Sequence, residues 1–279
     1  MTKLSEERFT GERALFTSSD LLIENCIFAD GESPLKESKN LEVLDSSFQW
    51  KYPFWYCENV NVKNTSFFTM ARAGIWYTNH VSLTDCLYEA PKGFRRCNEV
   101  VLKNVDFPDA SETLWFNKNI RMENVLAKGT YFAMGSENIY ADGFRLVGDY
   151  SFDGCKNIEM HNSKLLSKDA FWNCENVTVY DSYICGEYFG WNSKNVKLVN
   201  CTIESLQGFC YMDDVLLENC KLLNTTLSFE YSKVDADVTT AIDSVKNPYE
   251  GSIRAKEIKE LILEPDKCDP SKTKITTAC

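Results

Sequence analysis

An asparagine or aspartate returns along this chain every 19 to 21 residues, and this spacing constrains the fold more than any other feature. The series is interrupted only by Gly143 and consists of Asn25, Asp45, Asn64, Asp85, Asn104, Asn124, Asn162, Asp181, Asn200 and Asn219. A fixed period of this length is the sequence signature of a repeat architecture. Equal positions of successive repeats then stack into columns, so the sequence can be used as a map of the surface.

Each member of the series closes a short apolar stretch of the type Val60-x-Val62-x-Asn64. Alternation of apolar and polar residues with period two predicts a short strand with its apolar face inward. We call the first apolar residue of each stretch the anchor. The anchors are Leu21, Leu41, Val60, Val81, Val100, Ile120, Ile139, Ile158, Val177, Val196, Val215, Val234 and Ile253, which predicts about thirteen coils.

Further columns follow from this alignment. A second polar column lies directly before the anchor, and asparagine there suits sharp corners and amide ladders between coils. An aromatic segment precedes it, and a third short strand after the first Asn column is expected to form a continuous internal stack. That stack comprises Phe28, Phe48, Phe67, Tyr88, Phe107, Leu146, Leu165, Ile184, Ile203 and Leu222.

Two Asn ladders and three short strands per coil predict an all-β chain, a single-stranded right-handed parallel β-helix with coils of 19–21 residues. A leucine-rich repeat is the alternative, because its period is similar and it also carries an Asn ladder. Its Asn lies one residue further from the aliphatic position, however, and no coil here has helical periodicity. We expect the β-helix to span residues 1–264, with 1–19 as an N-terminal cap and 265–279 as a C-terminal tail.

The coils of the type N-V-x-V-x-N-[CST]-x-F, together with the stretch from Phe9 to Phe16, resemble the pectate-lyase-like superfamily. Within it, the chain is similar to an uncharacterised bacterial family of short-coil members. The superfamily includes polysaccharide lyases and glycoside hydrolases, so the resemblance implies the fold and leaves the activity open. The active-site patterns of those enzymes are not matched: the only adjacent Asp pair, Asp213-Asp214, lies at an Asn corner, and neither His80 nor His161 has a glycine neighbour.

Composition excludes several classes of function. A formal charge of −11 argues against nucleic-acid binding, which needs a basic face, and against docking on an anionic membrane. The N-terminus lacks a signal-peptide pattern and no run is long enough to span a membrane. We therefore expect a cytoplasmic protein with mostly reduced cysteines. No metal-binding spacing and no cofactor motif are present, and we interpret the cysteines as small buried residues and the two histidines as surface residues.

The aromatic segment supplies the candidate site. Counting back from the anchors gives one column of Trp55, Ile75, Arg95, Trp115, Met134, Asp153, Trp172, Trp191 and Cys210. The sequence leaves open whether this column fills the core or faces solvent. A second column mixes charge with tyrosine and is expected to face solvent; it comprises Tyr52, Arg72, Lys92, Glu112, Tyr131, Tyr150, Asp169, Tyr188 and Gln207.

Two hypotheses of function follow. Sugar rings stack on aromatic side chains, so the first is carbohydrate binding or processing on a strip formed by Tyr131, Tyr150, Trp172, Tyr188, Trp191 and Arg95. Asp153 and Asp169 are then the candidate acid and base groups, although glycoside cleavage needs a defined pair of carboxyls. The second is a non-enzymatic acidic scaffold that binds a basic partner. Aromatic residues also favour strands in general, so the strip has a purely structural interpretation as well. The sequence does not decide whether the protein is an enzyme, nor its oligomeric state.

Overall fold

The computed structural model describes residues 1–277 and shows a parallel β-solenoid of about 15 turns, which confirms the predicted fold class. The chain divides into two compact units, residues 1–140 and 141–279. A coil consists of one long strand, one or two shorter strands and sharp corners. Apart from a short 3₁₀ helix, η1 (Pro270–Lys272), all regular elements of the described residues are strands.

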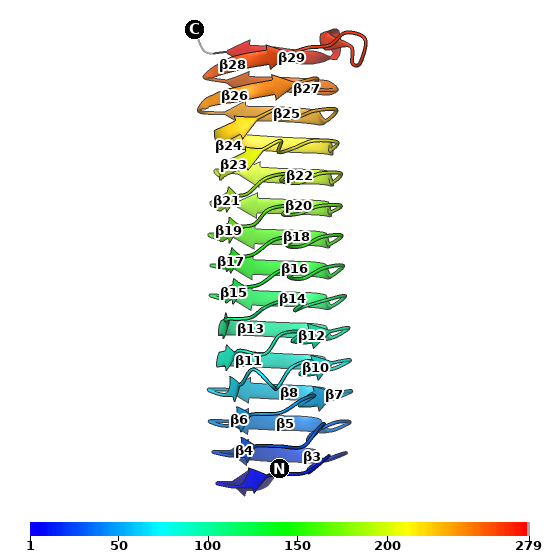
Figure 1. The fold of residues 1–279 in the computed structure, drawn as a ribbon, viewed down its shortest axis with the longest axis vertical. Coiled ribbons are helices and arrows are strands. Elements are labelled where there is room, and N and C mark those ends of the chain that lie inside the picture. The colour runs from blue at the N-terminus through cyan, green and yellow to red at the C-terminus, as the bar shows by residue number, and fades with distance from the viewer. Residues whose placement is uncertain (278–279) are drawn as a thin grey trace. The chain divides into compact units, whose positions relative to one another are not determined.

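The long strands of the first unit carry the anchors and stack in register (Figure 1). They are β1 (Thr2–Ser5), β3 (Ser19–Glu24), β5 (Lys39–Leu44), β8 (Glu58–Lys63), β11 (Asn79–Tyr88), β13 (Asn98–Phe107), β14 (Lys118–Glu123) and β16 (Glu137–Asp142), in which the division falls. The short strands are β2 (Arg8–Phe9), β4 (Ile27–Phe28), β6 (Ser47–Phe48), β7 (Phe54–Trp55), β9 (Ser66–Phe67), β10 (Ile75–Trp76), β12 (Phe94–Arg95) and β15 (Leu126–Lys128). Parallel pairing aligns Leu21, Leu41, Val60, Val81, Val100 and Ile120, as the anchor series predicts.

The second unit continues with the same alternation. Its strands are β17 (Arg145–Val147), β18 (Lys156–His161), β19 (Lys164–Leu166), β20 (Glu175–Tyr180), β21 (Tyr183–Cys185), β22 (Lys194–Val199), β23 (Thr202–Leu206), β24 (Asp213–Thr226), β25 (Lys233–Val238), β26 (Ala241–Lys246), β27 (Glu250–Ala255), β28 (Glu257–Ile262) and β29 (Thr273–Thr277). Ile158, Val177, Val196, Val215 and Val234 are aligned by parallel pairing.

The predicted count of thirteen coils is too low, and the last anchor is displaced. Both ends of the chain add a strand to the ladder, because β1 pairs with β3 and β29 pairs with β27. Near the C-terminus Val234 pairs with Gly251, and the predicted anchor Ile253 pairs with Ala236. This coil is two residues shorter than the 19-residue spacing assumed, so the inward apolar residue falls two positions later in the strand.

The core of the first unit contains an internal aromatic stack. Phe9, Phe28, Phe48, Phe67, Tyr88 and Phe107 follow one another with ring-centroid distances of 4.9, 4.6, 5.0, 4.5 and 5.4 Å. From Phe48 to Phe107 the side chains are fully buried. Each ring from Phe28 to Tyr88 therefore contacts a ring of the coil before it and a ring of the coil after it, as the column of the third strand predicts.

The Asn ladders are hydrogen-bonded corners with left-handed backbone. Asn104 has a φ of 51° and its Nδ2 donates to Asp85 Oδ1 at 2.8 Å. In the second unit Asp142 takes the place of Gly143 toward the following coil, because Asn162 Nδ2 donates to Asp142 Oδ1 at 2.9 Å. The amide bonds between coils offset the cost of the left-handed conformation and hold successive corners in register.

Candidate functional site

The tryptophans of the column face outward and are half-exposed, whereas its last member, Cys210, is buried. Phe54, Ile75 and Phe94, which precede its members, are fully buried and form the inward face of the three-stranded sheet β7–β10–β12. Parallel pairing places Trp76 beside Trp55, so the assignment of Ile75 to the outward column is wrong. Trp76 lies five residues before the anchor Val81, as Trp55 lies five residues before Val60, so Trp76 is the member of the column in this coil.

In the first unit this column is a stack of planar groups. The indoles of Trp55 and Trp76 lie 5.0 Å apart with only 5° between their planes. The Arg95 guanidinium follows, 4.5 Å from the Trp76 ring and 4.6 Å from the Trp115 ring. Both faces of the guanidinium are covered by aromatic rings, a cation–π arrangement that also covers the facing side of each ring.

Arg95 is neutralised as well as stacked. Its Nη2 lies 3.4 Å from Glu112 Oε2, and Lys92 Nζ lies 3.2 Å from the same oxygen. The Nε atom of Arg95 is buried and has no hydrogen-bond acceptor in the described part of the chain. A charged side chain that is only 21% exposed is tolerated here because two rings and one carboxylate surround it.

Each indole of the stack is also fixed by its N–H group. Trp55, Trp76 and Trp115 donate from Nε1 to backbone carbonyl oxygens of the next coil, at 2.7, 3.0 and 2.7 Å. Trp191 does the same in the second unit, at 2.5 Å. These indoles are oriented by the fold, which supports a structural role for the stack.

Trp172 differs from the other members of the column. Within residues 1–277, its indole N–H donates no hydrogen bond and its ring contacts no other aromatic ring, although it is half-exposed. Gly154 N–H donates to Trp172 O at 2.8 Å and Asn173 N–H donates to Trp191 O at 3.0 Å. Asp153, Trp172 and Trp191 therefore follow one another in successive coils of the second unit.

Polar groups line the coils around Trp172. Asn192 Nδ2 donates to Asn173 Oδ1 at 2.8 Å, and Asn173 Nδ2 donates to Asp153 Oδ1 at 3.0 Å. This chain of amides ends on a carboxylate whose second oxygen has no partner in the described residues. It presents donors and acceptors beside an indole face.

Asp169 does not face solvent as its column predicts. It lies at a corner with a φ of 54°, and the residue is only 5% exposed. Burial raises the pKa of its carboxyl; Asp149, Glu187 and Asp153 raise it further, and Lys168 opposes them. The short polar side chain fits the left-handed corner, and the packing of adjacent coils then covers it.

The remaining predicted residues fall into the two units separately. Arg95 and Tyr131 belong to residues 1–140, where the Tyr131 ring lies edge-on to Trp115 at 6.5 Å. Tyr188 belongs to the second unit, where its ring lies edge-on to Trp191 at 5.3 Å and Lys168 Nζ lies 5.3 Å from its centroid. Tyr150 is half-buried at a left-handed corner.

A second, more exposed ladder, which was not predicted from the sequence, lies beside the tryptophans of the first unit. Tyr56 and Tyr77 stack at 4.8 Å with 4° between their planes, and Arg96 lies 5.8 Å from the Phe116 ring. Trp76-Tyr77 repeats Trp55-Tyr56 at the same distance before the anchor, so the count of five and four residues back from Val81 identifies both columns.

The cysteines are free thiols in the described chain, and all but Cys185 are buried. Cys174 Sγ lies 2.9 Å from Phe152 O, and burial raises its pKa well above the ordinary value. Residues 1–277 contain no group of three or more His, Cys, Asp or Glu side chains arranged to hold a metal ion, and no helix long and apolar enough to cross a membrane.

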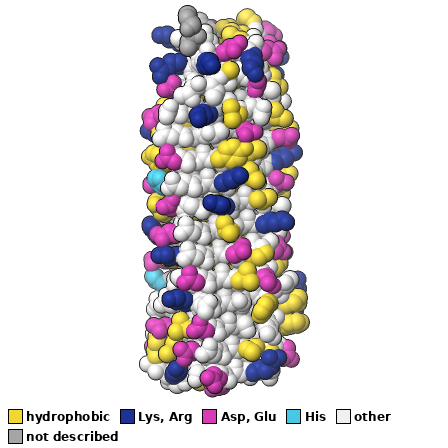
Figure 2. All heavy atoms as spheres, turned by 90° about the vertical axis from the view of Figure 1, so that its left-hand side faces the viewer, with side chains coloured by type: hydrophobic (Ala, Val, Ile, Leu, Met, Phe, Trp, Pro, Cys, Tyr) yellow, Lys and Arg dark blue, Asp and Glu magenta, His cyan; other side chains and the backbone are white. Residues whose placement is uncertain are grey.

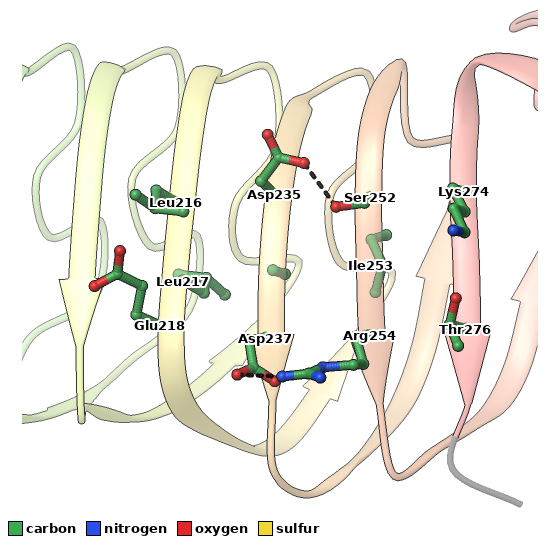
Figure 3. Close-up of a pocket in the computed structure, with 11 residues that line it drawn as sticks. Leu216, Leu217, Glu218, Asp235, Asp237, Ser252, Ile253, Arg254, Lys274 and Thr276 are labelled. Atoms are coloured by element: carbon green, nitrogen blue, oxygen red, sulfur yellow. Dashed lines mark hydrogen bonds and ion pairs between the residues drawn. The ribbon is translucent and has the colours of Figure 1, made fainter.

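A groove of about 360 Å³ lies near the C-terminus, on the outer face of β24, β25, β27 and β29 (Figure 3). Asp237 and Arg254 form a two-point ion pair across it, at 3.0 and 2.7 Å, and Ser252 donates to Asp235 at 2.7 Å. Asp237 and Arg254 therefore neutralise each other, while Glu218 pairs with Lys197 outside the groove at 3.0 Å. None of the sequence-predicted site residues lines the groove.

These features define a parallel β-solenoid with external aromatic ladders. The chain belongs to the family described as "Protein of unknown function (DUF3737)", whose model matches residues 2–276. This match confirms the sequence-based recognition of an uncharacterised family of β-helix proteins. No curated protein sequence matches the chain.

Several solved structures are similar at low sequence identity. The surface adhesin PfbA of Streptococcus pneumoniae is 11% identical over 80% of this chain and 70% of its own, with a TM-score of 0.38. The A-module of the mannuronan C-5 epimerase AlgE4 of Azotobacter vinelandii is 10% identical over 99% and 88%, with a TM-score of 0.27. The family 28 exopolygalacturonase of Yersinia enterocolitica is 9% identical over 98% and 71%, with a TM-score of 0.27.

Proposed function

We propose that this protein binds oligosaccharides at the surface of its second unit, around Trp172. The observation that carries the proposal is the free state of this indole. Four other members of its column, Trp55, Trp76, Trp115 and Trp191, are held by N–H bonds to the next coil, whereas Trp172 has neither such a bond nor a ring partner in the described residues.

The chemistry around Trp172 suits a sugar. The apolar C–H face of a pyranose packs on an indole, and its hydroxyl groups need both donors and acceptors. Asp153 accepts, and the amides of Asn173 and Asn192 supply further polar atoms in the adjacent corner column. Tyr188 and Trp191 extend the aromatic surface by one coil.

The stacked tryptophans of the first unit are less suited to the same task. Trp76 has Trp55 against one face and Arg95 against the other, so only ring edges remain accessible. A sugar would have to displace Arg95 to reach the face of the ring. Carbohydrate stacking therefore favours the second unit, and Arg95 is better explained as a structural residue.

Asp169 is the strongest candidate for a processing activity at this surface. Its raised pKa is the property that a general acid requires, and Asp153, the other carboxyl predicted from the sequence, is one of three carboxylates, with Asp149 and Glu187, whose charges raise this pKa further. Cleavage of a glycosidic bond demands a set separation between two carboxyls. The contacts around these two side chains define no such pair, so the proposal is limited to binding.

Glycan-array screening followed by calorimetric titration of the best oligosaccharide tests the proposal. Trp172→Ala should weaken binding by at least about tenfold, since aromatic anchors dominate such sites. Trp50→Ala is the matched control, because Trp50 is a half-exposed surface tryptophan of the first unit with a single cation–π contact, to Lys51. Equal affinities of Trp172→Ala and wild type, or the absence of any glycan ligand at millimolar concentration, would refute the assignment.

A Tyr150→Ala, Tyr188→Ala double variant tests the extent of the surface. It should weaken binding of longer oligosaccharides more than that of disaccharides, because the tyrosines lie at the corners of other coils. Equal losses for both ligand lengths would restrict the site to Trp172 and its immediate neighbours.

A further inference from the structure

The short strands of the second unit form an outward face that is separate from the tryptophan column. β17, β19, β21, β23 and the segment 221–223 of β24 pair in parallel, each with a buried middle residue flanked by two outward residues. The outward residues form two columns. The first comprises Arg145, Lys164, Tyr183, Thr202 and Lys221, and the second comprises Val147, Leu166, Cys185, Glu204 and Leu223.

The first column carries cations without carboxylate partners. Arg145, Lys164 and Lys221 are exposed and form no ion pair among residues 1–277; Lys164 Nζ contacts only the Tyr183 ring, at 5.4 Å. Nearby lysines outside this face are neutralised: Lys156 lies 3.3 Å from Glu175 and Lys168 lies 3.4 Å from Glu187. In a chain with a formal charge of −11, unpaired cations on one face are a local reversal of charge.

The second column is largely apolar and open to solvent. Val147 is 50% exposed and Leu223 is 38% exposed, and Leu206 at the end of β23 adds a further 45% exposed side chain. In Figure 2, which faces the side that carries the short strands, cationic and hydrophobic side chains lie next to each other. A cationic column beside an apolar column favours a ligand that has one acidic edge and one apolar edge.

The acidic residue within these columns is already engaged. Tyr183 Oη donates to Glu204 Oε1 at 2.7 Å, and Asn224 Nδ2 donates to Glu204 Oε2 at 3.1 Å. Glu204 is therefore occupied by its own neighbours and leaves the cations free. A shallow groove lined by Arg145, Lys164, Tyr183 and Thr202 borders the cation column, with Asn162 and Asp181 of the Asn ladder on its other side.

We propose that this face docks an extended acidic segment of a partner protein, one in which acidic and apolar residues alternate. Side chains of an extended segment point alternately to opposite sides. A segment running along the two columns would direct its carboxylates toward Arg145, Lys164 and Lys221. Its apolar side chains would then cover Val147, Leu166 and Leu223. Residues on the same side of the extended segment repeat at about 6.7 Å, whereas successive coils are about 4.8 Å apart. Long, flexible Lys and Arg side chains can adjust to this difference in spacing.

This partner differs from the basic partner expected of an acidic scaffold. It also differs from a sugar at Trp172, because the two surfaces share no residue. A free peptide and the same sequence within a folded protein offer identical chemistry at this face, so a synthetic peptide serves as the probe.

The experiment measures the fluorescence anisotropy of a labelled (Glu-Leu)₄ peptide titrated with the full chain at low salt. We expect saturable binding that weakens as salt rises, whereas a (Lys-Leu)₄ peptide should not bind and a (Glu-Ser)₄ peptide should bind more weakly. The double variant Arg145→Glu, Lys164→Glu should weaken binding by at least about tenfold. Leu206→Ser, Leu223→Ser should weaken it with little change in salt dependence.

The matched control is Lys194→Glu, Lys256→Glu, which reverses two exposed lysines of the same unit that form no ion pair within residues 1–277 and lie outside the two columns. It changes net charge by the same amount and should leave affinity within about twofold of wild type. Equal losses in both double variants would mean general electrostatics and would overturn the proposal. Tighter binding of a sulfated oligosaccharide than of the peptide, lost in the Arg145→Glu, Lys164→Glu variant, would also overturn it and assign the face to a glycan. Unchanged circular dichroism in each variant ensures that the loss reports binding rather than unfolding.

Discussion

Truncation of Arg95 should destabilise the first unit more than truncation of the adjacent Arg96. The Arg95 guanidinium lies between two indoles at 4.5 and 4.6 Å and also contacts Glu112 at 3.4 Å, whereas Arg96 has one ring contact at 5.8 Å. Two half-buried cation–π contacts contribute about 1 kcal/mol each, and a partly exposed ion pair contributes about 0.5 kcal/mol.

Arg95→Ala therefore removes about 2.5 kcal/mol of stabilising contacts. The desolvation cost of the buried Nε atom offsets part of this loss. This donor has no acceptor, so its removal recovers about 1 kcal/mol of desolvation cost. We therefore expect a net loss of about 1.5 kcal/mol in the free energy of unfolding for Arg95→Ala, and of about 0.5 kcal/mol or less for Arg96→Ala. Arg95→Lys should lose nearly as much as Arg95→Ala, because an ammonium group cannot cover two ring faces.

Urea unfolding followed by tryptophan fluorescence measures these differences, since the stack supplies three of the reporting indoles. The slope of the transition must stay constant across variants for the midpoints to be compared, because a solenoid can unfold in parts. If Arg95→Ala and Arg96→Ala differ by less than about 0.5 kcal/mol, the guanidinium sandwich does not stabilise the column and the assignment of a structural role fails.

Four further outcomes test other parts of the structure. Phe67→Ala removes a fully buried ring of the internal stack and should cost about 3–5 kcal/mol in urea unfolding; a loss below about 1 kcal/mol would contradict the packing described. Gly186→Ala should destabilise by more than about 1 kcal/mol in the same assay, because its φ is 155° and an added Cβ would overlap a carbonyl oxygen of the preceding coil. Burial raises the folded-state pKa of Asp169 above its unfolded value of 3.8, so the ionised carboxyl lowers stability near neutral pH and this penalty vanishes as pH falls below 3.8. Asp169→Asn should therefore raise the melting temperature at neutral pH and leave it unchanged at acid pH, and a rise that persists in acid would assign the effect to another cause. Iodoacetamide labelling of the native protein, mapped by mass spectrometry, should modify half-exposed Cys185 before buried Cys174, and the reverse order would contradict the burial of Cys174.

The architecture could be predicted from the sequence because successive coils repeat the same pattern of apolar, aromatic and Asn positions. The anchors from Leu21 to Ile120 in the first unit and from Ile158 to Val234 in the second meet one another in parallel pairs, and the column from Phe28 to Phe107 forms the expected stack. Periodicity failed near the C-terminus, where coil length changed: the 17-residue register between Val234 and Gly251 displaced the last anchor. In the coil before Val81, by contrast, the count of five residues from the anchor leads to Trp76 rather than to Ile75, in agreement with the strand register.

The candidate site depended on features that spacing cannot specify. A column assigns Trp172 and Trp191 equal positions, yet only Trp191 donates its indole N–H to the next coil. That difference arises from side-chain rotamers and from the residues packed nearby. The burial of Asp169 was missed for a related reason. The exposure of a corner residue depends on how the adjacent coils pack over it, and spacing in the sequence does not specify this packing.

The left-handed corners have a consequence for how the protein is made. In residues 1–277, 52 non-glycine residues have positive φ, including bulky ones such as Tyr77, Phe116 and Leu227. In an isolated coil this conformation is unfavourable by roughly 1–2 kcal/mol per residue, and hydrogen bonds to the neighbouring coil provide the compensation. A newly synthesised coil thus has no stable form until a completed one lies beside it. We therefore expect each finished turn to serve during synthesis as the template for the next one, and a truncated chain to keep its completed turns folded rather than to be uniformly unfolded.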